Sequence, residues 1–202
     1  AAGVVAAAPR QRPHPPHGRY GLAVSANFFD VLRVRPALGR AFLPGDDTAD
    51  RRNPVLVLSY DTWTQQYDAD PSIVGQDVWV GGQPFVVVGI APQGFNGLDI
   101  YLPPSFYLPL AMLPVVDTSR EAASLDDRSQ RSLRVVGRLA EGATPARANE
   151  EVRLIFSSLE RTQPATNRGH GVRVRTQEET RSDEYAPALA LGAMLVALAV
   201  AL

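Results

Sequence analysis

Alternating and continuous apolar runs along the chain predict several β-strands. Residues 20–26 (YGLAVSA) suit a short strand, and residues 55–59 (VLVLS) form a continuous apolar run typical of a buried one. Residues 76–80 and 83–90 are two β-rich runs joined by the glycine pair at 81–82, which can adopt the positive φ angles of a two-residue turn. This pair of runs is the clearest local signal in the chain and predicts a β-hairpin.

Apolar spacing also predicts one long amphipathic helix and two short ones. The long helix runs from Pro145 to Thr162, with Thr144 as its N-cap and proline at the first helical position. Its apolar positions recur at helical spacing: Ala148, Val152, Ile155 and Leu159. We expect this face to cover a sheet. The short helices are expected at 27–32, with Ser25 or Asn27 as the cap, and at 61–67.

Two more strands are expected in the C-terminal part of the chain, at residues 132–139 and 171–175. The second alternates cleanly between small or apolar residues and arginine (GVRVR) and suits a half-buried strand. The full order of predicted elements alternates strands and helices without a strict repeat. It predicts an α+β domain in which helices lie on a mixed sheet.

Composition narrows the chemistry that the chain can perform. Its 202 residues include 20 basic side chains, all arginine, against 21 acidic ones, so the formal charge is −1. A chain with so little net charge has no strongly basic field to bind nucleic acid. Without lysine or cysteine it cannot supply a catalytic lysine, a P-loop lysine, a thiol nucleophile or a cysteine-ligated metal site. This restricted set of side chains argues against an enzyme.

The few remaining candidates for metal binding lie in polar segments. His14 and His17 fall in a proline-rich stretch of residues 1–19, which we interpret as a linker or the start of a fragment, so we expect no metal there. The acidic pairs at 46–47 and 126–127 could bind a divalent cation, but neither belongs to an EF-hand-like repeat. We therefore interpret both pairs as solvated loop charges and predict no metal site and no cofactor.

The remaining candidates for catalysis or ligand binding are one histidine and four aromatic residues. His170 lies between two glycines with no carboxylate near it in sequence, so we interpret it as an exposed loop residue rather than a general base. Aromatic side chains could form a ligand box, but their spacing favours a role in the core. These residues are Phe28, Phe29, Trp63 and Trp79. The sequence therefore designates no catalytic, cofactor-binding or metal-binding residue.

The last 17 residues, 186–202 (APALALGAMLVALAVAL), contain no charged or strongly polar side chain. A spanning helix needs about 20 apolar residues, and a surface helix of a globular domain shows a polar stripe that this segment lacks. We expect the beginning of a transmembrane helix here, truncated by the end of the chain; the alternative is a buried helix of a soluble domain. The acid-rich flank at 178–184 weakly favours an extracytoplasmic location for the residues before it.

Three segments resemble the MacB-like periplasmic core domain of ABC-type permeases, and more closely the acidobacterial duplicated orphan permeases of the FtsX-like permease family. They are VSANFFDVLRVRPALGRAFLPGDD (24–47), PVLVLSYDTWTQQYDADPSIVGQDVWVGGQPFVVVGIAPQGFNGL (54–98) and SLRVVGRLAEGATPARANEEV (132–152). The resemblance covers about residues 20–202. One departure is Arg33, which stands where the family usually has glycine, and from which we expect only a local change of turn.

The resemblance implies a two-lobed domain at residues 20–182. One lobe would comprise about 20–54 plus 130–182, and an inserted lobe about 55–117. The domain would lie on the periplasmic side of the bacterial inner membrane, with mixed sheets and covering helices, followed by the membrane helix at 186–202. It would perform no chemistry and would couple movement of the membrane helices to substrate export or to periplasmic partners.

Partners also follow from the resemblance. A separate ATPase subunit would bind ATP, the C-terminal helix would contact membrane lipid, and a second permease copy or a periplasmic protein would be a further partner. Two other functions stay open from the residues alone. One is a membrane-anchored structural or signalling interaction domain without transport, and the other is a soluble hydrolase using His170 with Asp126 or Asp127.

Overall fold

The computed structural model describes residues 3–6, 19–48, 53–98, 103–116, 127 and 133–180. The chain divides into two units, residues 1–138 and residues 139–202, and each is described by itself. The elements of the first unit are β1 (Gly3–Ala6), β2 (Arg19–Val24), α1 (Phe28–Leu32), β3 (Leu38–Gly39), the 3-10 helix η1 (Pro44–Asp46), β4 (Val55–Leu58), α2 (Tyr60–Gln66), η2 (Pro71–Ile73), β5 (Asp77–Val80), β6 (Gln83–Ile90), β7 (Phe106–Pro109), η3 (Leu110–Met112) and α3 (Leu113–Val116). Those of the second unit are α4 (Pro145–Thr162) and α5 (Pro164–Asn167).

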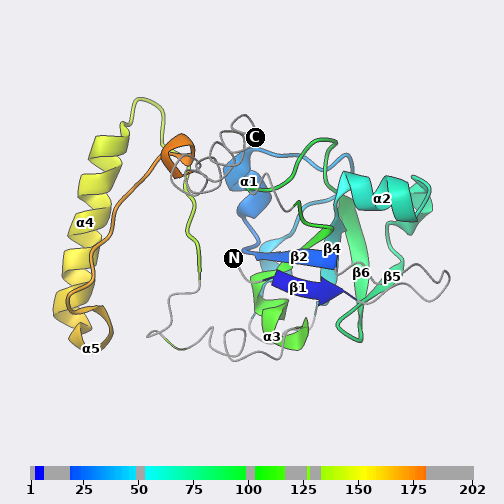
Figure 1. Cartoon of the computed structure of the whole chain (residues 1–202), viewed down its shortest axis with the longest axis horizontal. Coiled ribbons are helices and arrows are strands. Elements are labelled where there is room, and N and C mark those ends of the chain that lie inside the picture. Colours follow the sequence, from blue (N-terminus) through cyan, green and yellow to red (C-terminus); the bar gives the residue numbers. More distant parts are fainter. Residues whose placement is uncertain are drawn as a thin grey trace, which may run out of the picture. The chain divides into compact units, whose positions relative to one another are not determined.

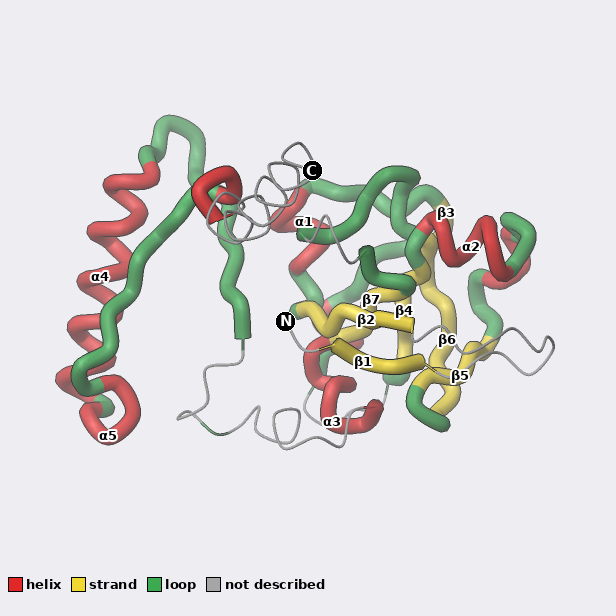
Figure 2. Tube along the Cα trace, in the orientation of Figure 1, coloured by secondary structure: helices red, strands yellow, loops and turns green. Residues whose placement is uncertain are grey.

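The strands of the first unit form one mixed sheet, shown in yellow in Figure 2. Within the described residues it has seven strands in the order β1-β2-β7-β4-β6-β3, and β5 also pairs with β6. The strand β4 lies between β6, to which it is parallel, and β7, to which it is antiparallel. The strand β2 runs parallel to β7, so the sheet joins the start of the unit to its end. These elements confirm the mixed α+β class predicted from the sequence.

The predicted hairpin is confirmed as β5 and β6. The two strands pair antiparallel with Val80 opposite Gln83, which leaves a two-residue turn at Gly81 and Gly82. Both glycines have positive φ, 57° and 81°, the conformation that L side chains rarely adopt and that this turn requires. A Cβ on Gly81 would also lie 2.9 Å from the Val116 carbonyl oxygen. Glycine at 81 therefore provides both the turn geometry and the room for α3.

Alternation along the strands builds a hydrophobic core on each face of the sheet. Successive residues of a strand point to opposite faces, so the fully buried β4 contributes Leu56 and Leu58 to one core and Val55 and Val57 to the other. Strand β7 divides in the same way, with Tyr107 on the face opposite to its neighbours. A continuous apolar run therefore marks a strand covered on both sides, as the sequence of residues 55–59 predicts.

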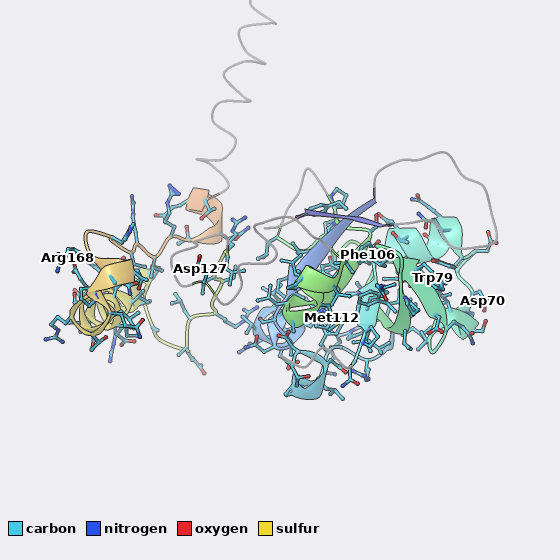
Figure 3. The ribbon with its side chains drawn as sticks, turned by 90° about the horizontal axis from the view of Figure 1, so that it is seen from below. Asp70, Trp79, Phe106, Met112, Asp127 and Arg168 are labelled. Carbon is cyan, nitrogen blue, oxygen red and sulfur yellow. The ribbon has the colours of Figure 1, made fainter. Side chains whose placement is uncertain are left out.

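Different short helices cover the two cores (Figure 1). Tyr60 and Trp63 of α2 pack against the first core, together with Met112 of η3 and Leu113 of α3. Phe29 of α1 is fully buried in the second. Figure 3 labels Phe106 and Met112 among the packed side chains of this unit, and it also labels Trp79 and Asp70. The helices predicted at 27–32 and 61–67 are thus confirmed, each within one or two residues.

Arg33 ends α1 in the left-handed conformation, with φ of 56° and ψ of 38°. The Arg33 N–H donates to the Asp30 carbonyl at 3.0 Å, and the Val34 N–H donates to the Phe29 carbonyl at 2.9 Å, a pattern that usually ends in glycine. The turn therefore forms with arginine in place, at the steric cost of a Cβ in the left-handed region. This geometry explains why glycine suits the position.

The second unit consists of α4 and a chain segment that returns beside it (Figures 1 and 2). Thr144 Oγ1 accepts a hydrogen bond from the Arg147 N–H at 3.2 Å, which confirms the predicted cap, and α4 has the predicted bounds. The Asn149 side chain accepts a bond from the Val174 N–H at 3.0 Å, and this bond holds the returning segment to the helix. A single helical turn follows at 177–180, with the Thr176 hydroxyl accepting from the Glu179 N–H.

Two predicted strands do not form among the described residues. Residues 133–140 and 171–176 form neither helix nor strand, because alternation determines which side chains share a face and does not provide a neighbouring strand. Val172 and Val174 are nevertheless half-buried, and Arg173 and Arg175 are exposed. The packing of α4 on a sheet stays a prediction, because the sheet belongs to the first unit and α4 to the second.

The predicted lobes and the predicted membrane helix stay predictions. The sheet pairs β2, from the first predicted lobe, with β7, from the inserted one, but pairing does not determine which segments move together. No helix among the described residues is long and apolar enough to cross a membrane. The apolar tail at 186–202 lies outside the described residues.

Replacing Arg33 with glycine should raise the free energy of unfolding by about 1 kcal/mol, because glycine removes the left-handed strain and no cap is lost. Chemical denaturation followed by circular dichroism measures the change. The matched control is Arg35→Gly, at an exposed position that does not have a positive φ, where we expect a loss of stability instead. Equal effects at the two positions would contradict the strain at residue 33.

Candidate functional site

One concavity of the first unit is an apolar groove of about 390 Å³. One wall comes from β2 and α1, and the other from the start of η3 and α3. Residues 133–136 line it as well. We call residues 133–138 the strap, because this segment without helix or strand lines the groove with its first four residues and then continues into the second unit.

Apolar side chains dominate the groove, and the polar ones are few. The apolar lining includes Leu22, Phe28, Val31, Leu98, Leu110 and Leu113. The polar lining consists of Tyr20, Ser25, Asn27 and Arg134. Among the described residues, Arg134 is the only charged side chain that lines the groove, and no carboxylate does. A mostly apolar cavity of this size with a few polar groups has the character of a small-molecule site.

Arg138 attaches the strap to α1. Its Nε–H donates to the Val31 carbonyl at 2.7 Å, and its second guanidinium nitrogen donates to the Leu32 carbonyl at 3.0 Å. These are among the last carbonyls of α1, which have no partner inside the helix. A cation at the C-terminal end of a helix also interacts favourably with the helix dipole. The guanidinium group therefore satisfies the helix end and holds the strap against the groove wall.

Asp47 holds the two walls of the groove together. Its Oδ2 accepts a bond from the Ala26 N–H at 3.1 Å, between the groove residues Ser25 and Asn27. Its Oδ1 accepts a bond from the Ala111 N–H at 2.8 Å, next to the groove residue Leu110. One carboxylate thus joins segments that are distant in sequence, through charge-assisted bonds that are stronger than neutral ones.

Asp46 is buried beside it, with only 6% of its surface exposed. One of its oxygens accepts from the Arg40 guanidinium at 2.6 Å and from the Leu43 N–H at 2.8 Å. Burial alone would raise the pKa of the Asp46 carboxyl, but the bonds from Arg40 and Leu43 and the charge of Arg40 hold it below its ordinary value. The interpretation of residues 46–47 as solvated loop charges is therefore wrong, because both carboxylates accept backbone N–H groups in a folded corner.

A second cavity, of about 240 Å³, lies between α2 and residues 94–96 and 103–105. Its polar groups are largely structural. The Ser59 hydroxyl accepts from the Thr62 N–H at 3.1 Å and donates to the Thr62 hydroxyl at 2.9 Å, so it serves as the N-cap of α2. Gln66 Oε1 is buried without a hydrogen-bond partner among the described residues. This cavity shows no pairing of a nucleophile with a base.

Within either unit, the described residues show no catalytic candidate of the sequence beside another. His170 is an exposed loop residue of the second unit, and its N–H donates to the Asn167 carbonyl at 3.3 Å. Asp127 is exposed and belongs to the first unit. His14, His17 and Asp126 lie outside the described residues. Among the described residues, no three histidine, aspartate or glutamate side chains gather as a metal site would require.

Three of the four aromatic candidates contribute to the cores and one does not. Phe29 is fully buried and stacks edge-on with Phe28 and with Tyr107, with ring centres 5.5 and 5.3 Å apart. Trp63 is half-buried, and its Nε1–H donates to the Asp70 carbonyl at 2.8 Å. Trp79 is 37% exposed, because Val78 and Val80 occupy the inner face of β5 and alternation places Trp79 outside. The prediction of a core role for Trp79 is wrong.

Sequence reasoning did not find the groove. Its lining comes from β2, α1, η3, α3 and the strap, and no local motif connects these segments. In the strap, Leu133 and Val135 are 52% and 91% exposed, although the strand predicted there would have buried one face. An apolar segment without a strand partner is a feature that only the folded chain displays.

Comparisons with known proteins give a match to one family and a similarity of fold. Over residues 1–155 the sequence matches the family described as the MacB-like periplasmic core domain. The fold is similar to the crystal structure of the periplasmic region of MacB from Actinobacillus actinomycetemcomitans, with a TM-score of 0.50 and 15% identity, over 78% of this chain and 63% of that one. No curated protein sequence matches this chain.

A second solved structure with some similarity is the extracellular domain of the noncanonic ABC-type transporter YknZ from Gram-positive bacteria. Its TM-score is 0.42 and its identity 23%, over 57% of this chain and 58% of that one. This chain therefore spans less than two thirds of the length of either solved domain.

Replacing Asp46 with asparagine should lower the free energy of unfolding by about 1 to 2 kcal/mol at pH 7, since the charge-assisted bonds to the half-exposed Arg40 are lost. Folding lowers the pKa of the Asp46 carboxyl below its ordinary value of 3.8. The stabilisation by the Asp46 carboxylate is therefore complete at pH values above 3.8 and is lost as the pH falls through the lowered pKa. The difference between wild type and variant should therefore vanish in strong acid. Denaturant titrations at several pH values measure it, with Asp77→Asn on the exposed side of β5 as the control.

Replacing Arg138 with glutamine should release the strap. Losing the two bonds to α1 destabilises the strap by about 1 kcal/mol, so its locally open form becomes roughly fivefold more populated. Limited trypsin digestion reports this directly, because Arg134 is a cleavage site inside the strap. Cleavage after Arg134 should become severalfold faster, while the control Arg35→Gln leaves it unchanged. Unchanged cleavage in Arg138→Gln would show that the attachment does not hold the strap.

Proposed function

Because the chain belongs to the MacB-like periplasmic core domain family, we propose that it is the extracytoplasmic domain of an ABC transporter permease that couples movement of membrane helices to export or to a periplasmic partner. The match over residues 1–155 carries this proposal. In a permease of this kind the domain lies on the outer side of the bacterial inner membrane. Its role there is mechanical, and it contributes no reacting group.

The connection between the two units supports a mechanical role. The strap passes from the first unit into the second, and residues 186–202, the apolar tail, follow later in the chain. Arg138 attaches the strap to α1, whose Phe29 is fully buried in a core of the sheet. A displacement of the chain beyond residue 138 therefore acts on the sheet through two directed hydrogen bonds rather than through a loose loop.

Energy for this movement would come from a separate ATPase subunit. Nucleotide binding by a P-loop needs a lysine that reaches the phosphates, and this chain contains no lysine. Residues 186–202 would enter the membrane and contact its lipid, and the periplasmic side would present the groove to a partner or a cargo. The expected assembly is thus a permease, its ATPase and a periplasmic component.

Cell fractionation and protease access test the location. The full-length protein should sediment with the inner membrane, and protease added to spheroplasts should cleave within residues 139–180 without lysing the cells. A cytoplasmic protein of the same cells serves as the control for lysis. Recovery of the full-length protein in the cytosol would contradict an extracytoplasmic domain, since its apolar tail would then lie in a soluble fold.

Affinity purification from mild detergent tests the coupling role. The full-length protein should retain an ATPase subunit, and a variant of the permease lacking residues 20–182 should retain the ATPase but lose the periplasmic partner or the transport phenotype. Purification without any ATPase would favour a membrane-anchored interaction domain instead.

A further inference from the structure

We propose that Asn96 is a site of covalent self-modification by deamidation, at which the side-chain amide leaves as ammonia and an aspartate or isoaspartate remains. The reaction needs an asparagine amide that is free to turn, a backbone N–H that is free to attack it, and a following residue that does not obstruct the approach. The loop at residues 92–98, which follows β6, brings these three features together. The inference goes beyond the proposed coupling role and does not depend on it, because it concerns chemistry within one loop.

The side chain of Asn96 is the amide that is free to turn. Asn96 is exposed, and its side chain makes no hydrogen bond among the described residues. Each of the other four asparagines of the chain makes at least one: Asn27, Asn53, Asn149 and Asn167. Such a bond has to break before the amide can turn, at a cost of about 1 kcal/mol. The amide of Asn96 moves between its rotamers without that cost.

The attacking group is the backbone nitrogen of Gly97. Its N–H makes no hydrogen bond among the described residues, and its φ is 67°, in the left-handed region that L side chains rarely adopt. Glycine has no Cβ to obstruct the approach of its own nitrogen to the preceding side chain, and its backbone angles adjust at little steric cost. Asn96 is also the only asparagine in the sequence that glycine follows. The sequence and the backbone therefore designate the same residue.

The loop is fixed immediately before this pair of residues. The Phe95 ring stacks on Tyr107 with ring centres 5.7 Å apart, and the Phe95 carbonyl accepts the Tyr107 hydroxyl at 3.4 Å. The Phe95 N–H donates to the Pro92 carbonyl at 3.1 Å, which closes a turn before it. Asn96 and Gly97 therefore reach the reactive geometry by local rotation, while Phe95 and the core stay in place.

The reaction is intramolecular until water enters. The Gly97 nitrogen attacks Cγ of Asn96, the new C–N bond closes a five-membered succinimide ring, and the bond from Cγ to Nδ2 breaks. The proton of the Gly97 N–H passes through water to the leaving nitrogen, which departs as ammonia. A water molecule then opens the ring. Addition at Cγ restores the ordinary backbone and gives aspartate, whereas addition at the main-chain carbonyl gives isoaspartate, and no atom is oxidised or reduced.

The modification changes one wall of the cavity beside α2. Asn96 lines that cavity, in which Asp61 is the only charged side chain among the described residues. The product places a second carboxylate in the lining. Isoaspartate also inserts a methylene group into the main chain between Phe95 and Gly97. The modified loop therefore differs from the original one in charge and, for isoaspartate, in length.

Mass spectrometry of the whole 202-residue chain, incubated folded at mildly alkaline pH and then digested with pepsin in acid, tests the proposal. We expect the peptide with Asn96 to gain the mass difference between an amide and an acid, and released ammonia to match that gain. Gln93 is the control inside the same loop, because it is exposed and precedes Gly94, whose φ is 77°. A ring formed from glutamine has six members and closes much more slowly, so Gln93 should remain an amide.

Two variants assign the reaction to this pair of residues. Asn96→Gln, at an exposed position, should stop the release of ammonia. Gly97→Ala should slow it about tenfold, because a Cβ obstructs the attack and makes the left-handed φ costly. That Cβ would lie 3.5 Å from the Tyr107 hydroxyl oxygen, an ordinary contact, so the loop has room for it. Circular dichroism verifies that both variants fold.

Three results would overturn the proposal. One is an Asn96 amide that stays intact in the folded chain over a period in which the urea-unfolded chain converts, since the loop then blocks the reactive geometry. Another is conversion of Gln93 as fast as that of Asn96. The third is ammonia release that persists in Asn96→Gln, which would place the chemistry elsewhere in the chain.

Discussion

The corner formed by Asp46 and Asp47 is the constraint on which the first unit depends. Asp47 accepts N–H groups from Ala26 and Ala111, two segments that no strand pairing joins directly at those residues. Asp46 turns the chain back on itself through Arg40 and Leu43, and so fixes the position of its neighbour. A backbone N–H left without a partner in such a corner costs free energy, so the two walls of the groove are held at one separation.

The groove and the connection to the second unit share a wall. Val31 and Leu32 line the groove with their side chains and accept the Arg138 guanidinium with their carbonyls. A displacement of the groove wall is therefore transmitted to the strap through α1, and a displacement of the strap is transmitted to the groove wall in the same way. That helix ends in a left-handed arginine, so local backbone strain lies where the groove wall meets the strap.

The fold tolerates wide sequence divergence because its main requirement is a pattern of apolar core positions along the strands and helices. At 15% identity to the MacB periplasmic region, what remains similar is the fold. In this chain that fold rests on a mixed sheet with a core on each face, and many combinations of valine, leucine and phenylalanine fill such cores at similar volume. Few positions are tied to one residue type, among them Gly81, whose φ is positive and whose Cβ would meet the Val116 carbonyl.

The sequence by itself determined the local elements whose signals are short-range: the hairpin with its glycine turn, the buried run of β4, and α4 with Thr144 as its cap. Alternation also assigned the faces of residues 171–175 correctly, yet no strand pairs with them among the described residues, because pairing needs a partner that local pattern does not specify. Only the tertiary structure placed Trp79 outside and Asp46 inside, and only it assembled the groove. Burial and hydrogen bonding depend on which distant segments meet, and that meeting is a property of the whole sheet rather than of any stretch of sequence.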